Sequence, residues 1–355
     1  MSPEILSKSQ THSQETLLKI PDLSPKKLKQ RLLHFVPELP ECASCDVQVL
    51  LNRDSSHLGP PEWILIAQTI LKSQSSYDGI VVLHGTDTLA YTASALSFLL
   101  RPCKKPVILT GAQRPLAAFR SDARRNLISA VEIAARIPHA AFRQVMVFFD
   151  DRLLQGNRAR KRSASEFAAF DSPQAPALAM VGTTIRYTDP RILMESLQIG
   201  KRRSTGRGKK LKPLFSKKVA MVHITPGSQF KMFEKMLPEL DALIFIAFPS
   251  GTAPTHQQDF LELLNQAKVK NIPVVLITEG ITPPPQRLSS NRLSRDRNDN
   301  PSAYEASKPL IEAGCIWGGR ITPECAYVKA SLICGQPDGK RQFNTLWKEN
   351  WAGEF

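Results

Sequence analysis

The chain has 355 residues, and its 47 Lys and Arg against 32 Asp and Glu give a formal charge of +15. A hydrophobic content of 42% is enough for a sizeable core and excludes collagen-like and low-complexity chains. The uncharged stretch 88–100 is too short and too rich in Thr and Ser to cross about 30 Å of hydrocarbon. The composition therefore predicts a globular protein without a membrane-spanning segment.

The N-terminal residues lack the positive start and apolar core of a secretory signal, so we expect a cytoplasmic protein. Six cysteines are too few for a disulfide framework, and Cys42-x-x-Cys45 has no second pair at zinc-site spacing, which favours ordinary thiols. Residues 200–218 contain nine basic side chains and no acidic one. The pI of 9.7 therefore reflects mainly one segment and requires no chain-wide nucleic-acid surface.

Short apolar runs alternate with amphipathic stretches from about residue 60 onward, a pattern typical of α/β proteins. In the first half it predicts strands over 81–83, 107–109 and 145–149, and a helix whose apolar face is formed by Leu89, Ala93, Leu96 and Leu100. In the second half it predicts strands over 219–224, 243–248 and 274–277 and helices over 229–240 and 256–267.

Periodic hydrophobicity stops within residues 187–218, where the boundary between two domains is predicted. The expected organisation is a two-domain α/β fold, with a larger N-terminal domain built on a mainly parallel sheet and a smaller C-terminal α/β domain. The predicted bounds are 1–28 for a divergent or truncated N-terminal segment, 29–190 for the N-terminal domain, 191–218 for a basic interdomain linker and 219–355 for the C-terminal domain.

The first clear strand runs directly into His84-Gly85-Thr86-Asp87-Thr88 and then into a helix. The carboxyl ends of strands in such sheets are where ligands bind. A hydroxyl and a carboxylate beside the N–H groups of a helix start can hold an amino-acid head group or support attack on a carbonyl. A purely structural alternative stays open, because Thr86, Asp87 and Thr88 are all good helix-capping residues.

Further motifs follow the next strands: Leu109-Thr110-Gly111-Ala112-Gln113-Arg114-Pro115 after the second and Gly156-Asn157-Arg158-Ala159-Arg160-Lys161 after the third. Read with Arg53-Asp54-Ser55-Ser56 upstream, this series of motifs resembles the type I (cytoplasmic-type) L-asparaginases, both in the residues of each motif and in the order of the motifs. The resemblance runs from about residue 28 to about residue 330. It takes in Ser250-Gly251-Thr252-Ala253-Pro254 and Thr322-Pro323-Glu324 in the second half.

The resemblance implies a hydrolase that converts L-asparagine to L-aspartate and ammonia without a metal or organic cofactor, assembled as a homodimer or homotetramer. Thr86, Asp87 and Lys161 match the family's catalytic Thr-Asp-Lys triad. The residues that match its substrate-binding positions are Asp54, Ser55, Ser56, Ala112 and Gln113. A partly buried ammonium beside Asp87 can draw a proton network toward Thr86. The alternative for Lys161 is a solvated basic loop, given the arginines around it.

One part of the family pattern is missing. The family opens with an apolar strand that enters a Thr-Gly-Gly-Thr-Ile turn, whose first threonine is the primary nucleophile, whereas residues 1–58 contain no glycine. The family's mobile-loop tyrosine has no counterpart either, since the first tyrosine is Tyr77. Val181-Gly182-Thr183-Thr184-Ile185 looks similar but stands at the wrong end of the first domain. Three explanations are open: the true start of the protein lies upstream of Met1, the chain is a degraded or repurposed member of the family, or another residue takes the place of the nucleophile.

Several functions remain open at this point. The leading interpretation is an asparaginase-family amidohydrolase with very low activity in residues 1–355, because covalent catalysis needs its nucleophile. The first alternative is a non-catalytic pseudoenzyme that binds L-aspartate or L-asparagine. Another is an asparaginase-like subunit of a tRNA-dependent amidotransferase, and a last one is nucleic-acid binding by 200–218 alone. We do not expect nucleic-acid or membrane partners.

Overall fold

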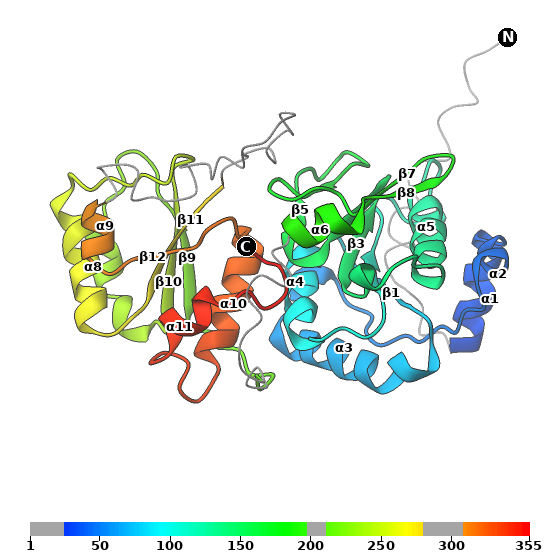
Figure 1. Ribbon diagram of the computed structural model, residues 1–355, viewed down its shortest axis with the longest axis horizontal. Helices are drawn as coiled ribbons and strands as arrows, with labels where there is room; N and C mark the ends of the chain where they lie inside the picture. Colours follow the sequence, from blue (N-terminus) through cyan, green and yellow to red (C-terminus); the bar gives the residue numbers. More distant parts are fainter. Residues whose placement is uncertain (1–24, 197–210, 280–307) are drawn as a thin grey trace, which may run out of the picture.

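The computed structural model describes residues 25–196, 211–279 and 308–355. Most of the predicted N-terminal segment 1–28 and half of the basic segment 200–218 lie outside the described residues. Figure 1 shows two lobes side by side, each built around its own sheet with helices packed on it. None of the helices in the described ranges is long and apolar enough to cross a membrane.

The larger lobe carries the elements that follow the predicted strand and helix pattern of the first half. Its helices are α1 (Pro25–Phe35), α2 (Leu39–Cys42), η1 (Ser55–His57), α3 (Pro60–Ser73), η2 (Gln74–Ser76), α4 (Leu89–Leu99), α5 (Ala123–Ala135), η3 (Ala140–Phe142), η4 (Gly156–Arg158) and α6 (Pro190–Ser196). Its strands are β1 (Ile80–Leu83), β2 (Val107–Thr110), β3 (Val145–Phe149), β4 (Arg152–Gln155), β5 (Arg160–Lys161), β6 (Phe170–Asp171), β7 (Ala179–Val181) and β8 (Ile185–Tyr187). The predicted strands in this half are therefore confirmed.

The larger sheet has the order β1-β2-β3-β4-β7-β8 and is mixed rather than mainly parallel. The first three strands run parallel, whereas β4, β7 and β8 are joined antiparallel. The change of direction comes from the tight turn between β3 and β4, where Asp150 adopts a left-handed φ of 56°. In the described ranges β1 is an edge strand, with β2 as its neighbour.

The smaller lobe has a four-stranded parallel sheet in the order β12-β11-β10-β9. Its elements are β9 (Val219–His223), α7 (Lys231–Glu234), η5 (Leu237–Glu239), β10 (Ala242–Ala247), α8 (Gln258–Val269), β11 (Val274–Thr278), α9 (Lys308–Glu312), β12 (Ile316–Trp317), α10 (Pro323–Cys334) and α11 (Phe343–Lys348). The three predicted strands are confirmed. The predicted helix 229–240 is wrong as one helix: it is divided into α7 and η5, because Pro238 has no N–H to continue the first.

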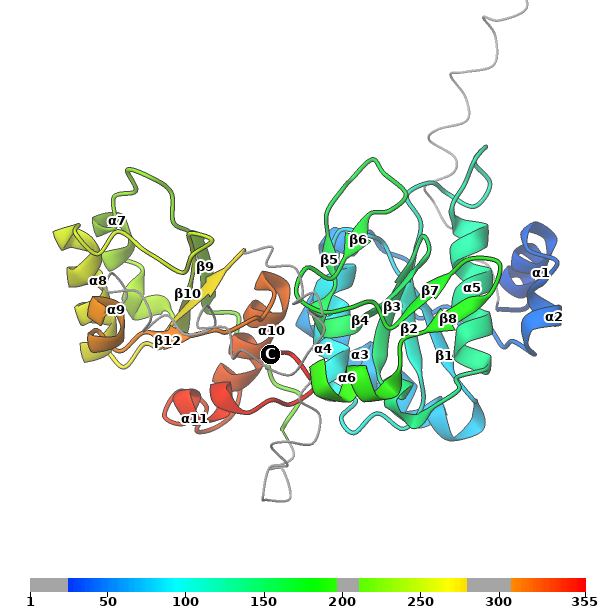
Figure 2. The same cartoon turned by 45° about the horizontal axis from the view of Figure 1, so that its top comes forward.

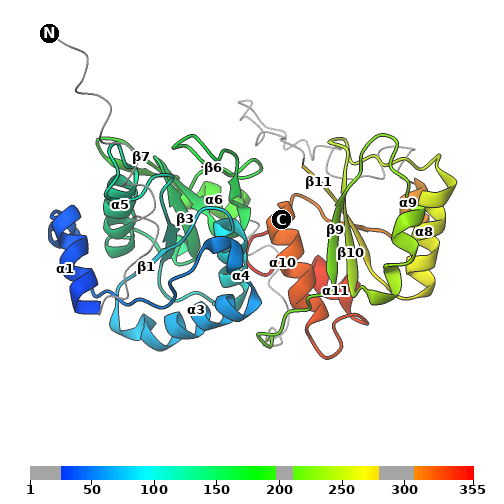
Figure 3. The same ribbon diagram turned by 180° about the vertical axis from the view of Figure 1, so that it is seen from behind.

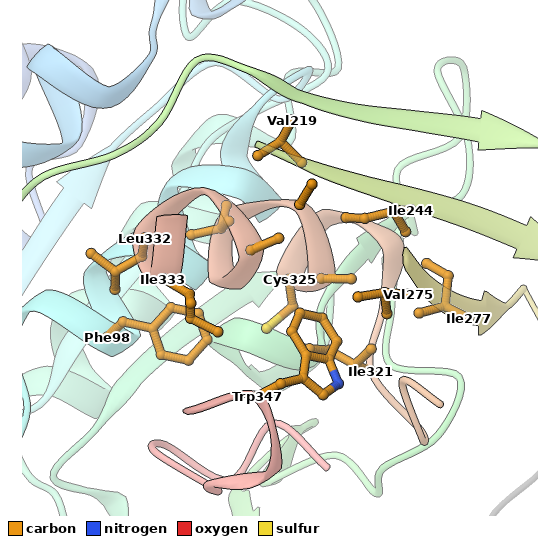
Figure 4. Packing of buried hydrophobic residues seen from close by; sticks show 14 of the residues in the cluster. Phe98, Val219, Ile244, Val275, Ile277, Ile321, Cys325, Leu332, Ile333 and Trp347 are labelled. Carbon is orange, nitrogen blue, oxygen red and sulfur yellow. The ribbon is translucent and has the colours of Figure 1, made fainter. Parts of the chain in front are cut away.

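Helix α10 lies between the two lobes in every view (Figures 1, 2 and 3). One buried hydrophobic cluster spans the junction, with Trp63 and Phe98 from the larger lobe and Ile244, Val275 and Trp347 from the smaller one. Figure 4 shows side chains of this cluster gathered around α10. Because apolar area from both lobes is removed from water together, the junction is held by the hydrophobic effect as well as by polar contacts.

The stretch predicted as a linker, 191–218, begins and ends with packed structure. Leu193 of α6 is buried in the core of the larger lobe, and Leu211 and Phe215 pack against the cluster at the junction. The backbone N–H of Lys212 donates to Gln336 Oε1 at 2.9 Å. The middle of this stretch, 197–210, lies outside the described residues.

Candidate active site

Three side chains converge at the carboxyl end of β1. Thr86 and Asp87 stand on the turn between β1 and α4, and Lys161 reaches them from β5. The Lys161 ammonium donates to Thr86 Oγ1 at 2.8 Å and to Asp87 Oδ1 at 2.7 Å. The Lys161 side chain is 20% exposed and that of Asp87 64% exposed, so the network is open to solvent on the side of Asp87.

Two glycines allow the strand ends to approach each other. A Cβ on Gly85 would lie 2.7 Å from Ser55 Oγ, and a Cβ on Gly111 would lie 2.3 Å from the carbonyl oxygen of His84. Both distances are below van der Waals contact, so only glycine fits without a shift of the neighbouring chain. The β1 turn, the β2 turn and the η1 segment are thereby packed together beside Thr86.

The η1 segment brings the predicted head-group residues to this turn. Asp54 Oδ1 accepts from Ser56 N at 2.8 Å and caps η1. Ser55 is buried, and its carbonyl oxygen accepts from Thr88 Oγ1 at 2.6 Å. The structure thus joins Ser55 directly to the β1–α4 turn. Asp54 and Ser56 are exposed, and the Asp54 carboxylate is engaged by its own segment rather than by the triad.

Ala112 and Gln113 lie on the turn after β2, between the β1 turn and the segment that follows Lys161. The Gln113 side chain donates to the carbonyl oxygens of Ser163 at 3.3 Å and Glu166 at 3.1 Å. Gln113 thus connects the β2 turn to the chain just after Lys161. Both residues are half-buried.

A buried carboxylate that sequence reasoning did not assign to the site shapes this turn. Asp122 accepts from the backbone N–H of Gln113 at 3.0 Å and of Arg114 at 3.0 Å, and from Asn126 Nδ2 at 3.2 Å. Asn126 Nδ2 also donates to the carbonyl oxygen of Gly111 at 2.9 Å. The signal was present in the sequence, because an Asp and an Asn four residues apart at a helix start lie on one helical face.

The buried His84 side chain supports the turn between β1 and α4 through two hydrogen bonds. Its Nδ1 lies 2.7 Å from the Gly85 carbonyl oxygen and its Nε2 lies 2.9 Å from Thr92 Oγ1. A carbonyl only accepts, so Nδ1 carries the proton and Nε2 accepts from the Thr92 hydroxyl. Burial lowers the pKa of His84, while the bond to the Gly85 carbonyl opposes that effect. The ring is therefore a neutral structural support rather than an acid or base.

The similar-looking sequence Val181–Ile185 is not part of the site. It forms the turn between β7 and β8, at the opposite edge of the sheet from β1. By contrast Leu83, which ends β1 beside Thr86, is 58% exposed. In the described part of the chain no strand pairs with the outer edge of β1.

The chain is similar to known proteins along most of its length. The family model "Asparaginase, N-terminal" matches residues 12–193. L-asparaginase 1 of Escherichia coli is 34% identical over 322 residues, which cover 90% of this chain and 86% of that protein. The 60 kDa lysophospholipase of Homo sapiens is 35% identical over 328 residues, covering 92% of this chain and 50% of that one.

Two further proteins are similar to this chain. One component of the glutamyl-tRNA(Gln) amidotransferase of Pyrococcus horikoshii is 32% identical over 340 residues, covering 93% of this chain and 71% of that protein. The crystal structure of L-asparaginase I from Vibrio cholerae superposes with a TM-score of 0.74 at 31% identity and covers 92% of both chains. The order of motifs, the two-lobed fold and these similarities agree, and the chain belongs to the asparaginase family.

Proposed function

We propose that this chain is an amidohydrolase that binds L-asparagine at the carboxyl end of β1 and hydrolyses its side-chain amide. The supporting observation is the Lys161 ammonium within hydrogen-bond distance of both Thr86 Oγ1 and Asp87 Oδ1. The products are L-aspartate and ammonia, with one water consumed. The proposed substrate-binding residues are Asp54, Ser55, Ser56, Ala112 and Gln113.

The chemistry assigned to each group follows from its donors and acceptors. As an ammonium, Lys161 polarises the Thr86 hydroxyl by donating to its oxygen. As an amine, it accepts the proton that Thr86 or a water loses during attack on the amide carbon. Asp87 accepts a hydrogen bond from the ammonium and holds the side chain in reach, so proton transfer and positioning come from one pair.

Residues 1–355 are proposed to turn over slowly, because residues 1–58 contain no glycine and therefore no Thr-Gly-Gly-Thr turn. Binding without rapid hydrolysis is then the expected behaviour. Covalent catalysis without its primary nucleophile commonly loses most of the rate. Ammonia release at a usual turnover of about 1–10³ per second would instead assign the nucleophile to a residue of this chain.

The test combines calorimetric binding of L-aspartate with ammonia release from L-asparagine. The wild type should bind L-aspartate, and Asp87→Ala should abolish binding because the acceptor that holds the Lys161 side chain beside Thr86 is lost. Asp78→Ala is the matched control, since Asp78 is an exposed carboxylate paired with Lys105 at 3.7 Å and lies away from the turn. Equal affinity of Asp87→Ala and Asp78→Ala, or no binding by the wild type, would contradict the proposal.

We further propose a cytoplasmic homodimer or homotetramer. The support is the similarity to L-asparaginase 1 of Escherichia coli over 90% of this chain, together with the resemblance that implies such an assembly. Size-exclusion chromatography with light scattering measures the mass directly. A monomer at micromolar concentration would contradict this assignment.

A further inference from the structure

The last residues of the chain form a buried segment, here called the tail and defined as Trp351–Phe355. Glu354 of the tail has a fully buried side chain, and so has Lys329 of α10. The two form an ion pair with 2.7 Å between Lys329 Nζ and Glu354 Oε1. An unpaired charge in this position would be costly, so each residue fixes the other.

The ion pair is fully supplied with hydrogen bonds. Lys329 Nζ also donates to the carbonyl oxygens of Trp347 at 2.8 Å and Glu349 at 2.6 Å. Glu354 accepts from the backbone N–H of Trp351 at 2.9 Å and Ala352 at 2.7 Å. The Lys329 ammonium lies 4.2 Å from the centroid of the Phe355 ring. The tail is therefore held around the buried ammonium of Lys329.

The outer side of the tail binds the segment that leads to Lys161. The carbonyl oxygen of Ala352 accepts from Gln155 Nε2 at 2.8 Å and Asn157 Nδ2 at 3.0 Å. The carbonyl oxygen of Gly353 accepts from Arg158 Nε at 2.8 Å, and that of Phe355 accepts from the same guanidinium. Arg158 is buried, and three residues after it stands Lys161.

Helix α10 also holds the residue next to Lys161 directly. Glu324, in its first turn, accepts from Arg160 Nε at 3.2 Å. Glu324 and Lys329 thus act on the same segment from one helix, the first through Arg160 and the second through the tail. Figures 1 and 2 show the C-terminus between the lobes, next to α10 and on the side of α4.

We propose that Lys329 and Glu354 are positioning residues: by locking the tail against Gln155–Arg158 they place the Lys161 ammonium beside Thr86 and Asp87. Neither residue touches the triad. Their effect passes through the backbone of residues 156–161, which is fixed by the tail at one end and by Gln113 beyond Lys161 at the other. Only the affinity readout below rests on the proposed function.

The test measures the rate at which an amine-acylating reagent modifies Lys161, relative to exposed Lys72 in the same sample, by peptide mass spectrometry. Lys329→Met and Glu354→Gln each leave one buried charge without its partner. Both should raise the relative rate of Lys161 by roughly tenfold, the factor that corresponds to losing one charged hydrogen bond. The affinity for L-aspartate should fall in parallel.

A double variant and a milder variant make the test specific. Lys329→Met/Glu354→Gln removes both charges, so its melting temperature should return toward that of the wild type, because replacing both members of a buried pair is far less disruptive than removing one. Labelling of Lys161 should nevertheless stay raised, because the ion pair that locks the tail is still missing. Gln155→Leu keeps the ion pair and removes only contacts to the tail. It should raise the rate in the same direction even if the single charge variants fail to fold.

Leu263→Ala is the control for loss of stability alone, because Leu263 is buried in the core of the smaller lobe on α8, away from the tail. It should lower the melting temperature without changing Lys161 labelling. If the tail variants behave like Leu263→Ala, with lowered melting temperature and unchanged labelling, the proposal is overturned. Altered labelling in a protein that never binds L-aspartate would uphold the positioning role and overturn the proposed function.

Discussion

The Lys161 ammonium donates to Thr86 Oγ1 at 2.8 Å although the two residues are 75 positions apart in the chain. The contact depends on a short strand, β5, whose preceding segment is anchored to the C-terminal tail and whose following loop is anchored to Gln113. A substitution that removes one of these anchoring contacts is expected to move Lys161 relative to Thr86 and Asp87, although all three side chains of the triad are still present.

Asp122→Ala should disorganise the turn that carries Gln113. The change leaves two backbone N–H groups without their acceptor, at a cost of about 1–3 kcal/mol for each group that stays buried. Chemical denaturation should show the lower free energy of unfolding, and calorimetry should show weaker binding of L-aspartate. Asp122→Asn is the paired comparison, because an amide oxygen in the place of Oδ1 can accept from both backbone N–H groups. Unchanged binding in both variants would show that the turn does not contribute to the pocket.

Gly111→Ala should be strongly destabilising, since the added Cβ would lie 2.3 Å from a backbone oxygen that cannot move independently. Gly182→Ala is the matched control, because a Cβ at Gly182 meets no atom within 4 Å. The melting temperature should drop for the first variant and stay near that of the wild type for the second. Equal melting temperatures would show that β1 and β2 can separate at this point without cost.

His84 should make the protein less stable as the pH falls below 6.5. Burial lowers its pKa in the folded state, so the unfolded chain takes up a proton that the folded chain resists. The stability that neutral His84 contributes is fully present above pH 6.5. The free energy of unfolding then decreases as the pH falls from 6.5 toward the folded-state pKa of His84, by at most about 1.4 kcal/mol per pH unit. Thermal unfolding of the wild type and His84→Gln between pH 5 and 8 measures the difference. Parallel profiles would contradict the assignment.

Glu354 should contribute to stability in a pH-dependent way. Burial opposes ionisation, but the Lys329 ammonium and two backbone N–H groups outweigh it and lower the pKa of Glu354 below its usual 4.5. The contribution is therefore fully present above 4.5 and is lost as the pH falls through the folded-state pKa. Glu354→Gln should cost about 3–5 kcal/mol at neutral pH. The difference in free energy of unfolding between the wild type and Glu354→Gln should become smaller in acid. A difference that stays constant with pH would argue against an ionised Glu354.

Local sequence determined six of the strands in the described residues. Apolar runs of strand length located β1, β2 and β3 and the three long strands of the smaller lobe, because burial of alternating or continuous apolar side chains acts over a few neighbouring residues. The motif blocks after β1 and β2 identified the family. The break of the predicted helix 229–240 has a local contribution, since Pro238 has no N–H for an intrahelical bond to the carbonyl of Glu234.

Tertiary structure decided what depends on distant partners. The antiparallel half of the larger sheet follows from a two-residue turn after β3 that apolar periodicity does not record. The contact of Lys161 with Thr86 joins residues 75 positions apart, and the contacts of Gln155 and Arg158 with the tail join residues still farther apart, so they exist only in the folded chain. The sequence shows which charged groups are present. The low dielectric and the fixed hydrogen-bond donors that determine how strongly a buried charge interacts exist only in the folded chain.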